Sequence, residues 1–441
     1  MAKHYDVVIV GAGPAGLMAA KTAGESGLSI ALLERKKDIG KIRRTDAGVV
    51  ALNEYLYGQI VTFNYKTRTL VFPVSGFSLK YEGPWNDNRY GFHFYSPGGK
   101  RFMVGDWAEL KKDPKKNSKG VALSKGLLLK SILGDAQSFG VDYFPNTNVQ
   151  KVNAEGDRVS VETSQGEYDG RFVVAADGVN SRVVRSLGLN KKRNFLGTSR
   201  YLTWVMTGVR PPDAEGLIFV MTMYGTFSVS QVCEEDHYHV GIMSSDPALD
   251  LEAQLERFTH EDPVFSNWFR EAKKTDDAEC CVVNGWQAME KPFHNNVIIV
   301  GDACWSEQFS NPPSLSAGYQ LGHTLTRAFM DGKCNEEGVA QYLGWYDSNI
   351  YKPYGQRAVG GGSLVKYLTA EELDYLAALV PEPVLSTASF LKVFNTLLET
   401  YRPLVPQIEK EHPRILEKFK RMGQDVEENQ AERRKTGFPN K

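Results

Sequence analysis

The feature that most constrains the fold is a glycine-rich turn between an apolar strand and a helix, close to the start of the chain. Residues 7–10 read Val-Val-Ile-Val, a continuously apolar run typical of a parallel strand that is buried on both faces. A helix is predicted over 17–23 and a second apolar strand over 28–33. Between the first strand and the helix, three glycines have the spacing G-x-G-x-x-G: Gly11, Gly13 and Gly16. This order predicts a βαβ unit.

Each glycine of the turn has a physical task. The first permits a tight turn, the second lets a pyrophosphate approach the backbone, and the third lets the helix pack closely on the strand. Pro14 and Ala15 lie at the helix N-terminus, where free N–H groups and the helix dipole attract phosphate. Glu34 ends the second strand, where a carboxylate accepts hydrogen bonds from a ribose 2′-OH. The unit predicts a dinucleotide site; the alternative is an ordinary glycine-rich turn of an α/β protein.

A basic, polar segment follows Glu34 and runs as far as Arg44. One interpretation is a solvated loop. The other is that an arginine of this segment, Arg35 or Arg44, contacts a phosphate or ribose of the bound cofactor. The residues alone leave both open.

The composition is that of an ordinary soluble globular protein, with 42% hydrophobic and 24% charged residues. At 441 residues the chain has room for two or three domains. A formal net charge of −1 gives no reason to expect nucleic acid as a partner. No apolar run is long enough to predict a transmembrane segment, while peripheral membrane contact stays open.

The cysteines and the first residues bear on the compartment. Five cysteines without a C-x-x-C pair argue against a disulfide framework and against an iron–sulfur cluster, and we predict no metal site. The first strand begins almost at once, which leaves no room for a signal or transit peptide. We therefore expect a reduced, cytoplasmic setting.

The rest of the chain alternates between helical and β-rich stretches. Residues 201–243 carry short apolar runs separated by turn residues, which predicts an antiparallel sheet of about four strands. A charged run with a proline over 111–119 predicts an exposed loop, and the charged end from residue 426 is expected to fray. Further helices are predicted over 123–139, 251–272, 316–329, 369–379, 389–401 and 406–422, with Thr369 as the N-cap of its helix.

One predicted strand alternates aromatic side chains and is followed by Ser-Pro-Gly-Gly, which predicts a hairpin. One face carries Tyr90, Phe92 and Phe94, and the other carries His93 and Tyr95. Such a face belongs either to the core or to the wall of a substrate pocket. His93 is accordingly either a structural or a catalytic residue.

Two further apolar strands end on an aspartate and a glycine. One is followed by Asp177 and Gly178, within the run D-G-V-N-S-R-V-V-R. The other is followed by Gly301 and Asp302, after which a proline-containing loop leads into the helix predicted over 316–329. Three separate strand ends therefore carry residues suited to a nucleotide cofactor.

In this order the three motifs resemble the flavoprotein superfamily of para-hydroxybenzoate hydroxylase, and within it the geranylgeranyl reductase-like branch. The resemblance covers residues 5–351. It implies an α/β fold in which a Rossmann-like FAD-binding domain is interleaved with an antiparallel β-sheet substrate domain and followed by C-terminal helices. The implied domains are 1–55, 118–187 and 286–357 for FAD, 56–117 and 188–285 for the β-rich substrate domain, and 358–441 for the helical C-terminal region.

The resemblance also implies FAD as the cofactor. The first glycine motif would cradle the pyrophosphate, Glu34 would hold the adenosine ribose, and Asp302 would bond the ribityl chain. The helix after Pro313 would aim its N-terminus at the flavin pyrimidine ring, where its dipole stabilises negative charge on the reduced flavin. The residues assigned to FAD are Gly11, Gly13, Pro14, Ala15, Gly16, Glu34, Arg35, Arg44, Lys125, Asp177, Gly178, Gly301, Asp302, Pro313, Ser316, Ala317 and Gly318.

The implied activity is that of an FAD-dependent oxidoreductase. It would reduce, or oxidise, a carbon–carbon double bond of a hydrophobic or conjugated small molecule by hydride transfer at flavin N5. The alternatives are an NAD(P)H- and O₂-dependent monooxygenase and a non-catalytic flavin electron-transfer partner. Electrons would come from a transient NAD(P)H or from a protein donor such as a ferredoxin. Alkene reduction also needs a proton donor, and the candidates by residue type are Tyr95, Tyr224, His93 and Asp46.

Overall fold

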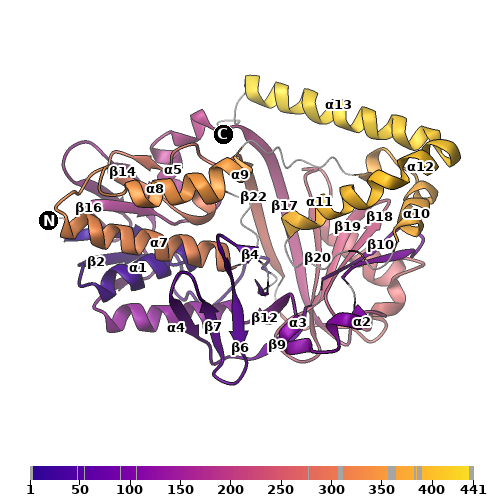
Figure 1. Cartoon of the computed structure of the whole chain (residues 1–441), viewed down its shortest axis with the longest axis horizontal. Helices are drawn as coiled ribbons and strands as arrows, with labels where there is room; N and C mark the ends of the chain where they lie inside the picture. Colours follow the sequence, from indigo (N-terminus) through magenta and orange to yellow (C-terminus); the bar gives the residue numbers. More distant parts are fainter. Residues whose placement is uncertain are drawn as a thin grey trace.

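The computed structural model describes residues 3–46, 48–53, 55–89, 91–105, 107–276, 278–305, 311–355, 364–381, 384 and 390–436. Two layered halves lie side by side along the long axis of the molecule (Figure 1). The half on the left of Figure 1 contains the N-terminal strand, and the half on the right contains a large twisted sheet with the C-terminal helices beside it. Tyr90, one of the residues of the predicted aromatic face, lies outside the described residues.

A parallel sheet forms the centre of the first half. Val7 and Ile9 contribute to the core on one of its faces, and Val8 and Val10 contribute to the core on the other, which explains why the run is apolar throughout. Its parallel strands are, in order, β13 (Asp142–Phe144), β2 (Ile30–Leu33), β1 (Lys3–Val10), β16 (Gly166–Ala175) and β24 (Val297–Ile299). Antiparallel additions are β15 (Val159–Thr163) and β14 (Val149–Asn153) beyond β16, and β23 (Phe293–His294) beside β24.

Helices α1 (Pro14–Glu25), α4 (Lys125–Ser138) and α7 (Asn311–Met330) pack on one face of this sheet, and α5 (Arg182–Ser186) and α8 (Ala340–Tyr346) lie around it. Helices α1 and α7 touch closely because α7 has glycines at the contact. A Cβ on Gly318 would lie 2.2 Å from the carbonyl oxygen of Ala15. A Cβ on Gly322 would lie 2.6 Å from the Cβ of Thr22.

The second half contains a mostly antiparallel sheet. The sequence-based prediction of an antiparallel sheet over 201–243 is confirmed. The strands β18 (Leu217–Thr222), β19 (Gly225–Gln231), β20 (His237–Ser244) and β17 (Phe195–Thr207) pair in that order. The predicted aromatic hairpin is also confirmed, and its first strand pairs in parallel with β18. The other strands are β11 (Arg101–Val104) and β10 (Phe92–Tyr95), with β21 (Lys273–Lys274) and β22 (Glu279–Trp286) beside β17.

Smaller sheets join the halves. Strand β12 (Gly120–Leu123) pairs with β3 (Val49–Ala51) and β9 (Trp85–Arg89). The remaining strands are β4 (Tyr55–Leu56), β5 (Gln59–Ile60), β6 (Thr62–Asn64), β7 (Thr69–Phe72) and β8 (Phe77–Lys80). Phe63, Leu70 and Tyr81 join the core of the first sheet, although the predicted domain limits placed them with the substrate domain. The limits themselves remain a prediction.

The predicted helix over 251–272 is wrong in length. Helix α6 (Leu251–Glu256) continues as a wider turn to Glu261 and stops there, because Asp262 is followed by Pro263. The run over 111–119, predicted to be a loop, contains the short helix α3 (Pro114–Asn117), which follows α2 (Trp107–Leu110).

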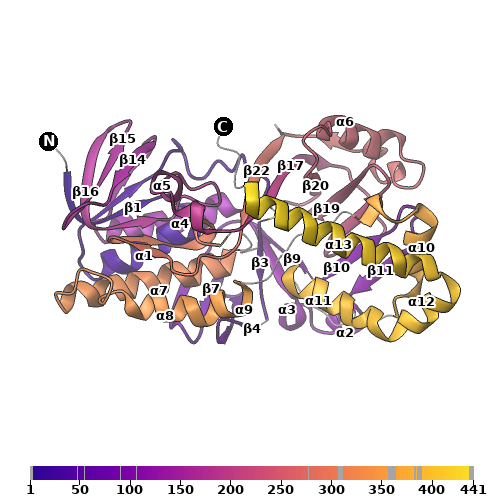
Figure 2. The ribbon, with the colours of Figure 1, turned by 90° about the horizontal axis from the view of Figure 1, so that it is seen from above.

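The short helix α9 (Lys352–Tyr354) precedes the C-terminal region. That region is helical, with α10 (Ala370–Leu379), α11 (Phe390–Tyr401), α12 (Val405–Glu411) and α13 (Pro413–Thr436). Thr369 caps α10 as predicted and forms a capping box with Glu372. The helix predicted over 406–422 is divided at Pro413, and the end predicted to fray is helical as far as Thr436. Figure 2 shows α13 running from α12 back toward β22. Lys418 anchors it by an ion pair with Glu372 at 2.6 Å.

Candidate functional site

A cleft opens where the carboxyl ends of β1, β2, β16 and β24 meet. Its lining comes from the turn after β1, the segment after β2, the N-terminus of α4, and the residues that follow β16 and β24. Parallel strands end at one edge of a sheet, so the three sequence motifs are brought to the same place. Arg35 and Arg44, left open between solvent and cofactor by the sequence, both line this cleft.

The three glycines of the first motif are not equivalent. Gly11 has a φ of +104°, and a Cβ there would lie 2.4 Å from the carbonyl oxygen of Ala176. A Cβ on Gly16 would lie 2.0 Å from the carbonyl oxygen of Gly11. A Cβ on Gly13, by contrast, would meet nothing within 4 Å. Contacts within the protein thus account for Gly11 and Gly16, and they leave Gly13 beside open space at the N-terminus of α1, which fits an anionic group approaching the backbone.

Glu34 is held rigidly at the end of β2. One carboxylate oxygen accepts the backbone N–H of Ala12 at 2.9 Å, and the other accepts that of Lys36 at 2.8 Å. Its own carbonyl accepts the N–H of Thr147 at 2.8 Å. Each carboxylate oxygen keeps acceptor capacity, so the side chain fits hydroxyl groups of a ribose.

Asp177 builds the turn after β16. Its carboxylate accepts the hydroxyl of Ser181 at 2.5 Å and the backbone N–H of Arg182 at 2.7 Å. Burial raises the pKa of Asp177, and these donors work against that rise. Gly178, with φ of +83°, would carry a Cβ into open space. The aspartate therefore fixes the loop, while the glycine keeps the cleft open.

Asp46 and Lys125 form an ion pair in the lining of the cleft. Asp46 also accepts the backbone N–H of Gly48 at 2.9 Å. Burial alone would raise the pKa of Asp46, but the Lys125 cation outweighs it, and the pKa lies below its ordinary value. Asp46 is therefore a carboxylate at neutral pH and is poorly suited to donate a proton.

Asp302 lines the same cleft at the end of β24. Burial raises the pKa of its carboxyl, and Arg44 and Lys125 oppose that rise. Within the described ranges no hydrogen-bond donor reaches this carboxyl, which fits an acceptor reserved for hydroxyl groups of a ligand.

The residues of α7 that were predicted to contact the cofactor do not line the cleft. Ser314 lines the cleft, whereas Pro313, Ser316 and Ala317 are buried behind it. The Ser316 hydroxyl has no partner among the described residues. Gly318 packs on α1, so its lack of a side chain serves helix packing. The loop before α7, residues 306–310, lies outside the described part of the chain.

Sequence reasoning missed several residues that line the cleft. Thr147 and Asn148 follow β13, and Lys36 follows Glu34. The rule that ligands bind beyond the carboxyl ends of parallel strands finds the first two once β13 is known to be a parallel strand. Burial lowers the pKa of Lys36. Arg182, whose guanidinium donates to the carbonyl of Val149 at 3.3 Å, adds a further cation to the lining.

The structure separates the proposed proton donors. Asp46 lines the cleft, while Tyr95, Tyr224 and His93 do not. Tyr95 donates to Asp213 and Tyr224 to Asp262, each at 2.6 Å, and burial raises the pKa of both phenols.

His93 is fully buried and accepts the indole N–H of Trp107 at 3.0 Å. Burial lowers the pKa of His93 to about 4, so the ring is neutral. His93 therefore has a structural role, and neither it nor Trp107 lines the cleft.

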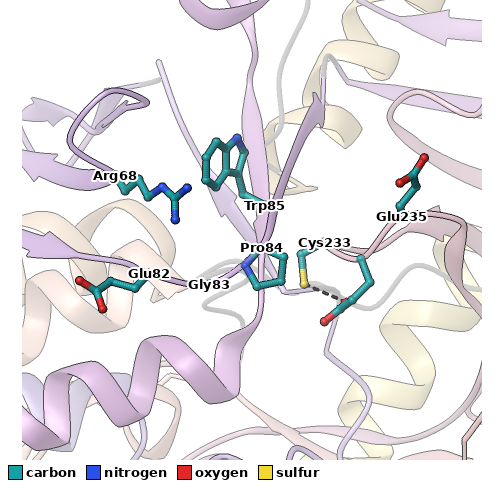
Figure 3. Close-up of a pocket in the computed structure, with 8 residues that line it drawn as sticks. Arg68, Glu82, Gly83, Pro84, Trp85, Cys233 and Glu235 are labelled. Carbon is teal, nitrogen blue, oxygen red and sulfur yellow. Dashed lines mark hydrogen bonds between the residues drawn. The ribbon is translucent and has the colours of Figure 1, made fainter.

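A second hollow lies away from the cleft, beside β9 and the turn after β19 (Figure 3). The Arg68 guanidinium lies 4.9 Å from the ring centre of Trp85. The Cys233 thiol donates to Glu234 at 3.0 Å, and burial raises the pKa of that thiol to about 12. These groups already bind one another, and the thiol stays protonated, so the hollow is not the candidate site.

Comparison with known proteins agrees with the cleft. Two protein-family models, both described as FAD binding domain, match residues 6–53 and 108–306. A digeranylgeranylglycerophospholipid reductase of Methanosphaera stadtmanae is 23% identical over 412 residues, covering 89% of this chain and 95% of the relative. Another, of Methanopyrus kandleri, is 27% identical and covers 87% of this chain and 92% of the relative. The chain is an FAD-dependent oxidoreductase that is similar to these reductases over most of its length.

Solved structures agree on the fold. A geranylgeranyl bacteriochlorophyll reductase-like protein of Thermoplasma acidophilum superposes with a TM-score of 0.68 at 19% identity, covering 93% of this chain and all of that one (100%). The flavin-dependent brominase Bmp2 superposes with a TM-score of 0.58 at 16% identity, covering 90% and 93%. Both confirm the predicted FAD-binding fold. Among the described residues, no helix is both long and apolar enough to cross a bilayer.

Proposed function

We propose that this protein reduces carbon–carbon double bonds in the isoprenoid chains of a lipid. FAD, when bound, supplies hydride chemistry. The chain's own residues would place the cofactor through Gly13, Glu34 and Asp302 and would lay an apolar substrate chain against the second sheet.

The observation that carries the proposal is a row of residues across one face of that sheet. Strand pairing aligns them, from the far edge to the edge beside the cleft, as Phe94, Phe219, Ser228, Gly241, Thr203 and Glu279. The row is aromatic at its start, where the rings of Phe94 and Phe219 stack 5.5 Å apart. It then becomes small or hydroxylated at Ser228, Gly241 and Thr203. Such a wall suits a long, slender, apolar molecule whose reacting end must reach the flavin.

The near end of this row touches the cofactor cleft. The Thr45 hydroxyl donates to the backbone carbonyl of Glu279 at 3.2 Å. The Thr203 hydroxyl donates to the hydroxyl oxygen of Thr45 at 3.3 Å. Thr45 stands between Arg44 and Asp46, both of which line the cleft. The aromatic end also packs with the C-terminal helices, since Phe94 and Phe219 contact the cluster that contains Ala377.

The relatives support the same substrate class, because they are named for a digeranylgeranylglycerophospholipid and align over nearly their whole length. The electron donor, NAD(P)H or a protein, is not part of the proposal. A chemical reductant therefore starts the test.

The test is anaerobic reoxidation. The FAD-loaded protein is reduced with dithionite, mixed with a geranylgeranyl ether lipid, and followed by flavin absorbance, with product mass as second readout. We expect reoxidation together with a gain of two hydrogens for each double bond reduced. The saturated lipid is the matched control and should leave the flavin reduced. An oxygenated product formed only with O₂ would favour the monooxygenase alternative and refute the proposal.

A further inference from the structure

Alkene reduction needs a proton as well as a hydride, and none of the donors named from the sequence suits the task. Tyr95 and Tyr224 already donate to the carboxylates of Asp213 and Asp262, and His93 is fully buried. Asp46 lines it but is paired with Lys125 as a carboxylate. A more suitable acid lies at the junction of the cleft and the second sheet.

Glu279 stands at that junction, beside the residues that line the cleft but not among them. It begins β22, next to β17, and its backbone carbonyl is bound by Thr45 of the cleft segment. Its side chain is 14% exposed, and its Oε2 atom has no hydrogen-bond partner among the described residues. A mostly buried carboxyl oxygen without a donor is costly as a carboxylate and is better tolerated as a neutral acid.

The charges around Glu279 also favour its neutral, protonated form. Burial and the negative charges of Asp46 and Asp276 together raise the pKa of Glu279 to about 7, against a hydrogen bond from the Asp46 backbone. The facing base is the imidazole of His239 on β20, whose Nε2 lies 3.9 Å from Oε2 and whose side chain is 16% exposed. Lys125 is paired with Asp46 and so does not neutralise Glu279.

We propose that Glu279 gives the proton that accompanies hydride transfer to the alkene, and that His239 restores that proton from solvent. This rests on the proposed function. The position at the near end of the substrate row, the unpartnered Oε2 and the neighbouring imidazole carry it together.

The step balances without another reactant. The hydride and its electron pair come from the reduced cofactor and form one new C–H bond, the Glu279 O–H bond breaks to form the other, and the π bond is lost. Glu279 is left as a carboxylate and takes a proton from protonated His239, which takes one from water. The alkene is reduced by two electrons, and the cofactor is oxidised by the same two.

The test compares FAD-loaded wild type with Glu279→Gln, which keeps the shape and loses the acid, and with Glu290→Gln, an exposed control. We expect Glu279→Gln to slow alkene-dependent reoxidation about 100-fold, the usual order for a general acid, with FAD affinity unchanged. Glu290→Gln should behave as wild type. Infrared titration of the oxidised protein should show a carboxyl that deprotonates near pH 7 in wild type and in Glu290→Gln, and that is absent in Glu279→Gln.

Glu279→Asp provides the second variant. It keeps an acid and should recover part of the rate, with an altered pH profile, which a merely structural role would not produce. Two results would overturn the assignment of Glu279 and leave the proposed function intact. One is that the alkene reoxidises Glu279→Gln at a rate within twofold of wild type, and the other is that the titrating carboxyl persists in Glu279→Gln. If no isoprenoid alkene reoxidises wild type, the proposed function fails and this inference fails with it.

Discussion

Two single variants, Gly13→Ala and Gly16→Ala, test whether glycines of one motif have different tasks. Gly13 would face the ligand, and Gly16 would permit close packing within the protein. The residues are three positions apart and receive the same new methyl group. A Cβ on Gly16 would lie 2.0 Å from the carbonyl oxygen of Gly11 and 3.1 Å from the Cβ of Ala176. A Cβ on Gly13 would meet no protein atom within 4 Å.

The stability effects follow from these contacts. Gly13 is the N-cap of α1 with φ −79° and ψ −179°, which alanine also adopts. Alanine costs up to about 1 kcal/mol at an N-cap but gains about 0.4–1 kcal/mol by restricting the unfolded chain. The net change for Gly13→Ala is therefore within about 0.5 kcal/mol. Gly16→Ala gains about 1 kcal/mol of helix propensity but overpacks against backbone by about 3 kcal/mol, a net loss of about 2 kcal/mol.

The FAD affinities should separate differently. A methyl group on Gly13 occupies the approach of the pyrophosphate, so we expect binding to weaken about 100-fold, equivalent to about 2.7 kcal/mol. The assays are urea denaturation of the FAD-free protein and titration with FAD followed by flavin fluorescence. Wild-type affinity in Gly13→Ala, or equal destabilisation by both variants, would refute the account of this turn.

Three further predictions concern other parts of the chain. Half-buried Arg193 donates to the backbone carbonyls of Ala303 and Cys304 at 3.2 and 2.9 Å. Arg193→Met should weaken FAD binding at least about tenfold through the Asp302 loop, since charged hydrogen bonds contribute about 1.5–3 kcal/mol each, and unchanged affinity would contradict this. Thr369→Ala should lower the free energy of unfolding by about 1 kcal/mol, with faster amide exchange confined to the first turn of α10; unaltered exchange there would count against the cap. The pKa of Glu279 is raised from 4.5 to about 7, so wild type should lose up to about 3 kcal/mol of stability as the pH rises between these two values. The urea midpoints of Glu279→Gln should not fall with pH in this way. If the midpoints of the two proteins depend on pH alike, the pKa of Glu279 is not raised.

The cofactor half was predictable because its signals are local. An apolar strand, a turn and an acidic residue each occupy a few consecutive positions, and the parallel-strand rule then brings Gly13, Asp177 and Asp302 to one edge. The glycine spacing could not separate Gly13 from Gly16, since only the atoms around each position differ.

The proton donors could not be predicted in this way. A period of two places His93 and Tyr95 on one face of β10, but it does not say which face the cofactor half covers. The face of β10 that is turned toward the cofactor half carries Phe94, and not His93 or Tyr95. Glu279 looked like an ordinary acid before two cysteines, because its burial depends on Thr45 and Asp46, far away in sequence. The packing of α13 on α10 could not be predicted for the same reason, since Lys418 and Glu372 meet only after folding.

The measurement that tests the central claim most directly is anaerobic oxidation of the dithionite-reduced, FAD-loaded protein by a geranylgeranyl ether lipid. The account predicts loss of the reduced-flavin spectrum with one equivalent of double bond saturated per flavin, and no change with the saturated lipid. A flavin that stays reduced in the presence of the unsaturated lipid, or a protein that does not bind FAD, would contradict it.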